Sequence, residues 1–513
     1  MVEQMQADLS AARALPAWRR PHRPAATVEA STEPSVTAPR LLAVMMVTLF
    51  IPGNFSFVGT QMSPNRALLL GLMPFMIWRW LKGTAGKANA ADVCMLLCVL
   101  WAGVSLTINH GLSTLPRSVI VCTEIFGAYL FGRLFVRNTA DYRRFFLLLA
   151  CGFAVILPFA LIELVTGQNL IRTLVGHVFN MPPRQSNLRP RLGLIRAQAI
   201  FDHPILYGLV ASIAVANVLY IFRDRFVRSV QLAGLFVFSA FITLSSGPMI
   251  AIGIQLILTA WDRLLFFMRF KWIVLGFLAV MAMMLLKIGS QFHVLDFVVD
   301  HLMFNPETAY GRVINFEYGM AEVRRHPLFG IGLGDWIRPW DRAPTFDNFW
   351  LNHAMRFGIP SFAFLALAIG INCARILAQN TLTPREVDYR AGYLIALAGL
   401  ALVLGTVYIW SVTAVTVFMY CGMGSWLYMK SPAEEVDEAV RARRAAQARA
   451  AGRSFETAGP GAAPRAGSAA GSTTHAPPLR PGRAPAHPGG RIPAGRGAAR
   501  HRAVPPLKHD GDV

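Results

Sequence analysis

Five arginines gather in one stretch of the chain that is too polar to cross a membrane. No acidic residue occurs between Gly167 and Asp202. The arginines in this stretch are Arg172, Arg184, Arg189, Arg191 and Arg196. A guanidinium presents a planar fork of donors that matches the oxygens of phosphate or carboxylate. The pattern indicates a site for an anionic ligand. The alternatives are pairing with acids of another loop and contact with lipid phosphates.

A second group of polar residues follows an amphipathic segment. The segment TAYGRVINFEYGMAEVRR (308–325) predicts a helix, because its apolar residues recur on one face at Val313, Phe316, Met320 and Val323. We expect this helix to lie at the membrane–water boundary. Glu317, on the helix, and His326, directly after it, are candidate catalytic groups. For Glu317 and Arg324 a solvated ion pair is the alternative interpretation.

Three glycines at alternate positions follow in HPLFGIGLGDW (326–336). Their spacing is G-x-G-x-G and no strand is expected before them, so the dinucleotide-binding pattern is excluded. Two interpretations remain. Free N–H groups of the glycine segment could form an anion-binding nest, or the segment is a tight turn that leads the chain toward the next span.

Asp347 lies where an apolar run begins near Phe349. A side-chain oxygen at this position can cap the helix that follows. Thr345 could cap it instead, which would leave Asp347 for proton transfer. The nearby Trp336 and Trp350 fit an interfacial aromatic belt, and stacking on sugar rings is the alternative.

The elements that must position these groups are membrane helices. Hydrophobic residues make up 54% of the 513-residue chain and charged residues 15%, against about 25% charged in soluble domains. Apolar runs long enough for a hydrocarbon core of about 30 Å recur along the chain. They predict an all-α polytopic protein with about twelve spans, at 41–58, 65–81, 92–109, 117–136, 144–166, 201–222, 229–246, 248–262, 271–288, 349–374, 390–408 and 410–429.

Basic residues orient the predicted spans. Each alternate loop, beginning with the one near Arg79, is basic, which places both termini in the cytoplasm and the loops 167–200 and 289–348 outside. The segments 1–40 and 430–513 have compositions typical of disorder, and 1–40 carries no signal-peptide pattern. The net charge of +21 fits a basic tail near an anionic leaflet better than nucleic-acid binding, and we expect no nucleic-acid partner.

Two acids fall inside the predicted spans. Glu124 lies deep in its span, whereas Glu163 lies near the outer end of the next one. Because a charge in hydrocarbon is unfavourable, each should face a cavity or a partner.

Four segments resemble the bacterial O-antigen ligase/polymerase superfamily, and within it the exopolysaccharide polymerases. The resemblance covers about residues 41–429. Its segments are IELVTGQNL (162–170), RLGLIRAQAIFDHPILYG (191–208), GRVINFEYGMAEVRRHPLFGIGLG (311–334) and DNFWLNHAMRFGIP (347–360).

The resemblance implies a C-type glycosyltransferase-like fold and a metal-independent, cofactor-free enzyme of the bacterial inner membrane. Such an enzyme polymerises undecaprenyl-diphosphate-linked repeat units on the periplasmic face. It contacts membrane lipid, and a flippase and a chain-length regulator are expected partners. By resemblance, Arg191, Arg196 and Arg312 would hold the diphosphate. Candidate glycan-binding residues are His203, Asp335, Trp336, Trp350 and Glu163.

The chain departs from the family pattern at two places. Ligases carry a His-Asn or similar pair where this chain has Asp347-Asn348, and a carboxylate with a pKa of about 3.9 is the weaker base. Many relatives carry an arginine near SSGP (245–248), where this chain has none. The first departure favours a polymerase over a ligase. Ligation to a lipid A core and transport of lipid-linked oligosaccharide remain the alternatives.

Overall fold

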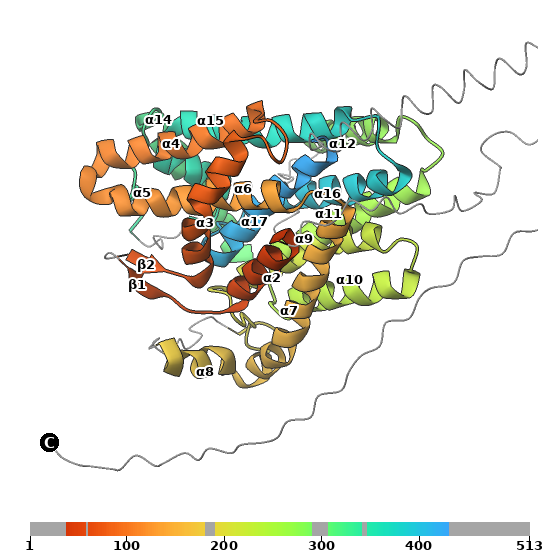
Figure 1. Cartoon of the computed structure of the whole chain (residues 1–513), viewed down its shortest axis with the longest axis horizontal. Helices are drawn as coiled ribbons and strands as arrows, with labels where there is room; N and C mark the ends of the chain where they lie inside the picture. The colour runs from red at the N-terminus through yellow and green to blue at the C-terminus, as the bar shows by residue number, and fades with distance from the viewer. Residues whose placement is uncertain (1–36, 58–59, 180–189, 290–305, 341–345, 430–513) are drawn as a thin grey trace, which may run out of the picture. The chain divides into compact units, whose positions relative to one another are not determined.

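A computed structural model describes residues 37–57, 60–179, 190–289, 306–340 and 346–429 (Figure 1). The chain divides into two compact units at Arg444, and all of the described residues belong to the first. The predicted tail 430–513 lies outside the described residues. The predicted N-terminal segment 1–40 does so too, except that the first helix already begins at Thr37.

Helices make up about three quarters of the described residues, and there is almost no strand. The long helices are α2 (Thr37–Phe50), α3 (Pro64–Leu81), α4 (Ala90–His110), α7 (Thr139–Thr166), α9 (Pro204–Ile221), α10 (Phe226–Phe241), α11 (Ser246–Leu264), α12 (Lys271–Gly289), α14 (Pro306–Arg325), α15 (Phe349–Ala378), α16 (Pro384–Val403) and α17 (Ser411–Met423). Shorter pieces are η1 (Leu112–Thr114), α5 (Leu115–Cys122), the π-helical η2 (Thr123–Gly127), α6 (Ala128–Phe135), α8 (Leu170–Phe179) and η3 (Gly424–Leu427). A single antiparallel hairpin joins β1 (Phe55–Phe57) to β2 (Thr60–Met62).

Among the described residues, five helical segments are long and apolar enough to cross a membrane. They are Ala90–His110, Leu112–Phe135, Thr139–Thr166, Pro204–Ile221 and Phe349–Ala378. The all-α membrane character predicted from composition is therefore confirmed. A helix overlaps each of the twelve predicted windows. Among the other helices, α2, α10 and α17 have only 14, 16 and 13 residues. The count of twelve spans remains a prediction.

The predicted spans 229–246 and 248–262 correspond to two separate helices. α10 ends at Phe241 and α11 begins at Ser246. The turn between them contains Leu244, whose φ of 47° lies in the left-handed region. A residue in this conformation cannot continue a right-handed helix, so SSGP begins a new helix and does not bend a single one.

One set of loops gathers at a common end of the helices. The Ile195 amide donates to the Leu164 carbonyl at 3.1 Å, and the Phe349 amide donates to the Leu404 carbonyl at 2.8 Å. The Ala197 amide donates to the carbonyl of Ile242, in the α10–α11 turn. Ile195 and Ala197 belong to the predicted outer loop 167–200, and the other four residues lie at the ends of predicted spans that border outer loops. We call this the outer end, after its predicted side of the membrane.

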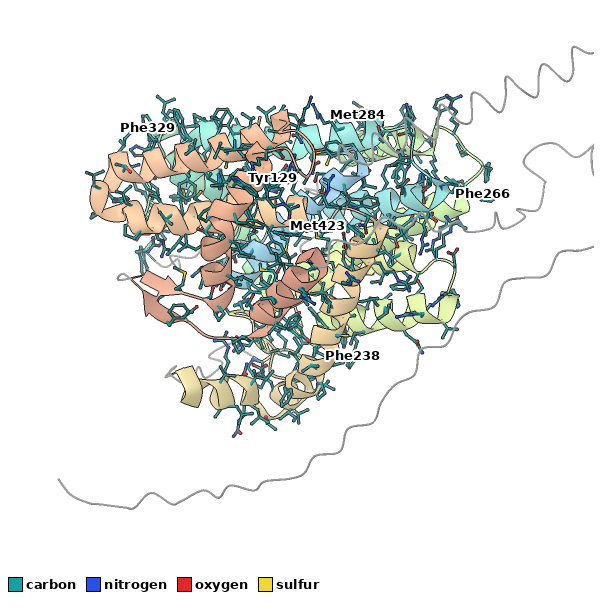
Figure 2. All side chains as sticks on the ribbon, in the orientation of Figure 1. Tyr129, Phe238, Phe266, Met284, Phe329 and Met423 are labelled. Atoms are coloured by element: carbon teal, nitrogen blue, oxygen red, sulfur yellow. The ribbon has the colours of Figure 1, made fainter. Side chains whose placement is uncertain are left out.

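The loops predicted to lie inside gather at another end, which we call the inner end. Arg137 donates to the Met429 carbonyl at 3.1 Å, and Arg223 pairs with Asp388 at 2.6 Å. Figure 2 labels Phe266, which follows α11, on the opposite side of the view from Phe329 of the glycine segment. The sides of the membrane on which the two sets of loops lie remain predictions.

The core between the two ends is closely packed. α6 and α17 lie side by side, and a Cβ added at Gly422 would overlap the Tyr129 carbonyl (Figure 2). An ion pair with both side chains fully buried joins α6 to the first turn of α4: Arg133 Nε lies 2.8 Å from Asp92. Tyr129 and Trp80 also donate to Asp92, so its charge is fully hydrogen-bonded. This network fixes the chain entering α4 against α6.

Candidate functional site

The glycine segment is a docking turn, and it does not form an anion nest. Its amides already have acceptors: those of Ile331 and Gly332 donate to the carbonyls of Met355 and Arg356 at 2.9 and 2.8 Å. Gly330 and Gly332 both have φ of 59°, which side-chain-bearing residues rarely adopt. Of the two interpretations left open by the sequence, the tight turn is the correct one.

The glycine turn packs against a break in α15. At Gly358 the backbone has φ 86° and ψ 164°, and Pro360 follows, so the helix kinks there. The Ile359 amide donates to the Pro327 carbonyl at 2.8 Å. From α4, Trp101 donates to the Leu328 carbonyl at 2.9 Å. This close backbone contact positions the end of α14 relative to the beginning of α15.

Asn348 caps α15, so the predictions that Asp347 or Thr345 caps it are wrong. The Asn348 side chain accepts from the Leu351 amide at 2.9 Å. Adjacent Asp and Asn side chains can both serve as caps, and the backbone places the second one at the helix start. Asp347 is therefore not the helix cap, and its catalytic role stays a prediction. Thr345 lies outside the described residues.

The other candidate catalytic residues lie around α14. Glu317 is on an exposed part of the helix. His326 Nε2 lies 3.5 Å from the carboxylate of Glu322, which is buried in the same helix and also pairs with Arg325. Arg312 is on α14, but its side chain lies outside the described ones.

Arg191 and Arg196 both contact the α10–α11 turn. Arg191 Nη1 donates to the Leu244 carbonyl at 2.7 Å. Arg196 is buried, and it donates from Nε to the Thr243 carbonyl at 3.2 Å and from Nη2 to Ser245 Oγ at 2.7 Å. Arg196 thus anchors a turn whose left-handed residue needs support, which argues against its predicted role at the diphosphate. Arg191 is only partly buried and remains a candidate.

The carboxylate of Glu163 is bound by the protein itself, which argues against its predicted contact with a glycan. The Gln198 and Ala199 amides donate to its Oε2 at 3.1 and 2.8 Å, and Asn169 donates to Oε1 at 3.0 Å. Ala199 has φ of 49°, so this carboxylate holds a bend in the backbone. Glu163 is 1% exposed and joins the end of α7 to the chain entering α9.

The predicted tryptophans are also held by the protein itself. Trp336 is 3% exposed and packs edge-on against Phe346 with ring centroids 5.1 Å apart, so neither the aromatic belt nor stacking on a sugar applies to it. Trp350 donates from its indole to the Ala401 carbonyl at 2.9 Å and is partly buried.

Asp335 is exposed and pairs with Arg338, whose hydrogen bond lowers the pKa of that carboxyl.

Glu124 has the partner that its place in a span requires. Arg66, near the start of α3, lies 2.6 Å from its carboxylate. Glu124 lies in the π-helical turn η2, a feature often found at functional sites. Arg117, at the start of α5, and Tyr408, before α17, are electrostatic neighbours of Glu124. The sequence indicated a partner or cavity, but nothing in it singled out Arg66.

A pocket opens at the same end of the helices. It is small and partly open to solvent, with a cavity volume of about 40 Å³. Its walls come from the turn after α2, from α8, and from the starts of α9 and α17. The polar lining residues are Asn54, Ser63, Arg172, Asp202, Ser411 and Thr413.

His203 lies beside this pocket, but it serves as a helix cap. Its Nδ1 accepts from the Ile205 amide at 3.2 Å at the start of α9. Its ring lies 6.3 Å from that of Trp410, which lines the pocket. His203 therefore shapes the pocket wall, and its predicted contact with a glycan is untested.

Within the described part of the chain, no group of three or more His, Cys, Asp or Glu side chains could hold a metal ion. His353 is buried in α15, with Nε2 2.9 Å from Ser361 Oγ. The charged and hydroxyl-bearing residues that line the pocket are one arginine, one aspartate, two serines and one threonine.

No protein-family model and no curated protein matches this chain.

Proposed function

We propose that this protein joins lipid-linked oligosaccharide repeat units into a polysaccharide at the outer face of the bacterial inner membrane. The donor would be a glycan on undecaprenyl diphosphate, and the acceptor a sugar hydroxyl of a second lipid-linked unit. The proposal draws on the four segments that resemble the O-antigen ligase/polymerase superfamily and on the groups at the outer end.

The observation that carries the proposal is the concentration of arginines at the outer end. A basic outer end runs against the positive-inside trend, so it needs a reason other than topology. Several of these arginines stand at or near the starts of helices, where the helix dipole adds to their positive potential. The set comprises Arg117 and Arg191, together with Arg66 and Arg172, which pair with Glu124 and Asp202, and Arg196, which binds the α10–α11 turn.

This arrangement fits the chemistry of the proposed reaction. The bond that breaks joins an anomeric carbon to the diphosphate, so negative charge grows on the leaving oxygen. Guanidinium groups directed at that oxygen stabilise the charge. The bond that forms joins the same carbon to the acceptor hydroxyl, whose proton must pass to a base. Asp347 is the candidate base from the sequence, and Glu124 is the acid that the structure adds.

The test is polymerisation in liposomes. The purified protein receives undecaprenyl-diphosphate repeat units whose sugars face outward, and the products are separated on a gel and identified by mass spectrometry. We expect a ladder of lipid-linked multimers. Arg191→Ala and Arg312→Ala should lower its rate of formation by about a hundredfold or more, because each removes a donor to the leaving group.

Arg144→Ala is the matched control. Arg144 is a half-exposed arginine at the inner end, paired with Asp141 at 3.8 Å, so its loss should leave the ladder unchanged. Thermal unfolding of each variant in detergent checks that it folds. Normal ladders from both Arg191→Ala and Arg312→Ala would refute their assigned roles.

Other outcomes separate the alternatives. Product that forms only after a lipid A core is added would show ligation. Substrate that crosses a sealed bilayer without a new glycosidic bond would show transport. Either result would replace polymerisation as the proposed function.

A further inference from the structure

Two arginines at the inner end contact the same aromatic ring. Phe222 follows the last turn of α9. The guanidinium carbon of Arg143, near the start of α7, lies 5.0 Å from the centroid of this ring, and that of Arg228, in the first turn of α10, lies 4.9 Å from it. The two guanidinium groups can therefore be no further apart than the sum of these distances. We call Arg143 and Arg228 the arginine pair.

The arginine pair has no acidic partner. Asp141, on α7, pairs with Arg144, and Asp388, on α16, pairs with Arg223. Asp224, in the turn before α10, is exposed and forms no ion pair within the described residues. Among the same residues, neither member of the arginine pair has a hydrogen bond or ion pair to an oxygen. Two positive charges thus lie close together without a counter-ion.

A ligand can reach the arginine pair, because both side chains are partly exposed. The Nε of Arg143 is buried, so a ligand would meet the two terminal nitrogens of this side chain. Arg228 lies where the positive end of the helix dipole disfavours a cation, and the first turn of α10 contains no acidic residue. An anion bound by both guanidinium groups would relieve their mutual repulsion and offset the dipole.

We infer that the arginine pair binds the phosphate of an anionic phospholipid. Two guanidinium forks suit the several oxygens of one phosphate. Exposed apolar side chains lie beside Arg228 on α10: Phe226 is 75% exposed and Val227 is 67% exposed, and they offer a surface for acyl chains. Basic groups between helices at the end of a membrane domain are typical sites for such lipids.

The charge of the site selects the headgroup. Phosphatidylethanolamine carries an ammonium group, which the two guanidinium groups repel. Phosphatidylglycerol carries a net negative charge and no ammonium, so we expect it to bind more tightly. A soluble phosphate ester would match the arginines but would leave Phe226 and Val227 in water.

The test is lipid binding to the purified full chain in a nonionic detergent, measured by native mass spectrometry. The probes are phosphatidylglycerol and phosphatidylethanolamine with identical acyl chains, and glycerophosphoglycerol, which is the same anionic headgroup without chains. Phosphatidylglycerol should bind most tightly. Arg143→Gln and Arg228→Gln should each weaken its binding by about fivefold or more, because each removes one positive charge that faces the phosphate.

Arg144→Gln is the matched control. It makes the same change of charge at the neighbouring position, but Arg144 already pairs with Asp141 at 3.8 Å. Its affinity for phosphatidylglycerol should equal that of the wild type. Arg143→Lys keeps the charge and loses the fork, so it should retain part of the affinity. Thermal unfolding checks that each variant folds, and Arg228→Gln, at the start of a helix, keeps the test open if Arg143→Gln does not.

A double variant tests whether one phosphate contacts both arginines. If it does, Arg143→Gln and Arg228→Gln together should weaken binding by less than the product of the two single losses. Losses that multiply would mean two separate contacts and would overturn the shared site.

Three further outcomes would overturn the inference: phosphatidylethanolamine binds as tightly as phosphatidylglycerol, Arg144→Gln weakens binding as much as the arginine-pair variants do, or glycerophosphoglycerol binds as tightly as the lipid. The last would show a site for a soluble phosphate ester. Because the measurement uses no oligosaccharide repeat units, its failure would leave the proposed polymerisation untouched, and the absence of polymerisation would leave the lipid site untouched.

Discussion

Substitution of Gly358 by alanine tests whether the glycine turn holds α14 to α15. A Cβ at this position would overlap the Leu328 carbonyl and lie 3.0 Å from the Phe329 nitrogen. These are backbone atoms, so no side-chain rotation relieves the overlap. The segment cannot easily retreat, because the Ile359 amide, Trp101 and Asn109 all bond to its carbonyls.

The expected loss of stability has two parts. The backbone conformation of φ 86° and ψ 164° is close to glycine-only, and a side-chain-bearing residue there costs about 1–3 kcal/mol. Overpacking of a tightly packed contact adds about 1–3 kcal/mol. The sum of about 2–6 kcal/mol is a large fraction of the usual 5–15 kcal/mol free energy of unfolding.

Gly370→Ala is the control on the same helix. Nothing lies within 4 Å of a Cβ at Gly370. Alanine should therefore stabilise α15 there by about 0.5–1 kcal/mol through its helix propensity. The assay is unfolding of both variants in mixed micelles, followed by circular dichroism. Gly358→Ala should lower the midpoint of the unfolding transition, and Gly370→Ala should raise it. Equal stability of the two variants would refute the contact between the glycine turn and the kink.

Two further predictions concern single side chains. Asp92→Asn leaves Arg133 buried beside a neutral amide and should destabilise the protein by about 3–5 kcal/mol, whereas Asp388→Asn at an exposed pair should change unfolding by at most about 1 kcal/mol. Similar shifts from both would contradict the burial argument. Asn348→Ala should cost about 0.5–2 kcal/mol of stability through loss of the cap, and Asp347→Ala should cost less stability than that while it lowers polymerisation. A greater loss of stability in Asp347→Ala than in Asn348→Ala would reverse the assignment of the cap.

The sequence by itself determined the class of the protein and most helix positions. Apolar runs and a low charge content are sums over many residues, so they do not depend on which helix packs against which. The excess of arginine between Gly167 and Asp202 and the exclusion of a dinucleotide-binding pattern around Gly330 also followed from the sequence, because both depend only on composition or local spacing. The need of Glu124 for a partner also followed from its place in a span.

The tertiary structure decided which polar groups face open space. Glu163 was a plausible ligand-binding acid until amides of Gln198 and Ala199, far along the chain, were seen to satisfy it. Trp336 was a plausible sugar platform until Phe346 was seen to cover it. The contact of Arg143 and Arg228 with one ring gave no signal in the sequence. Local spacing predicts what a residue can do, but its partners come from distant segments, and only their packing decides whether a group is satisfied or left to bind a ligand.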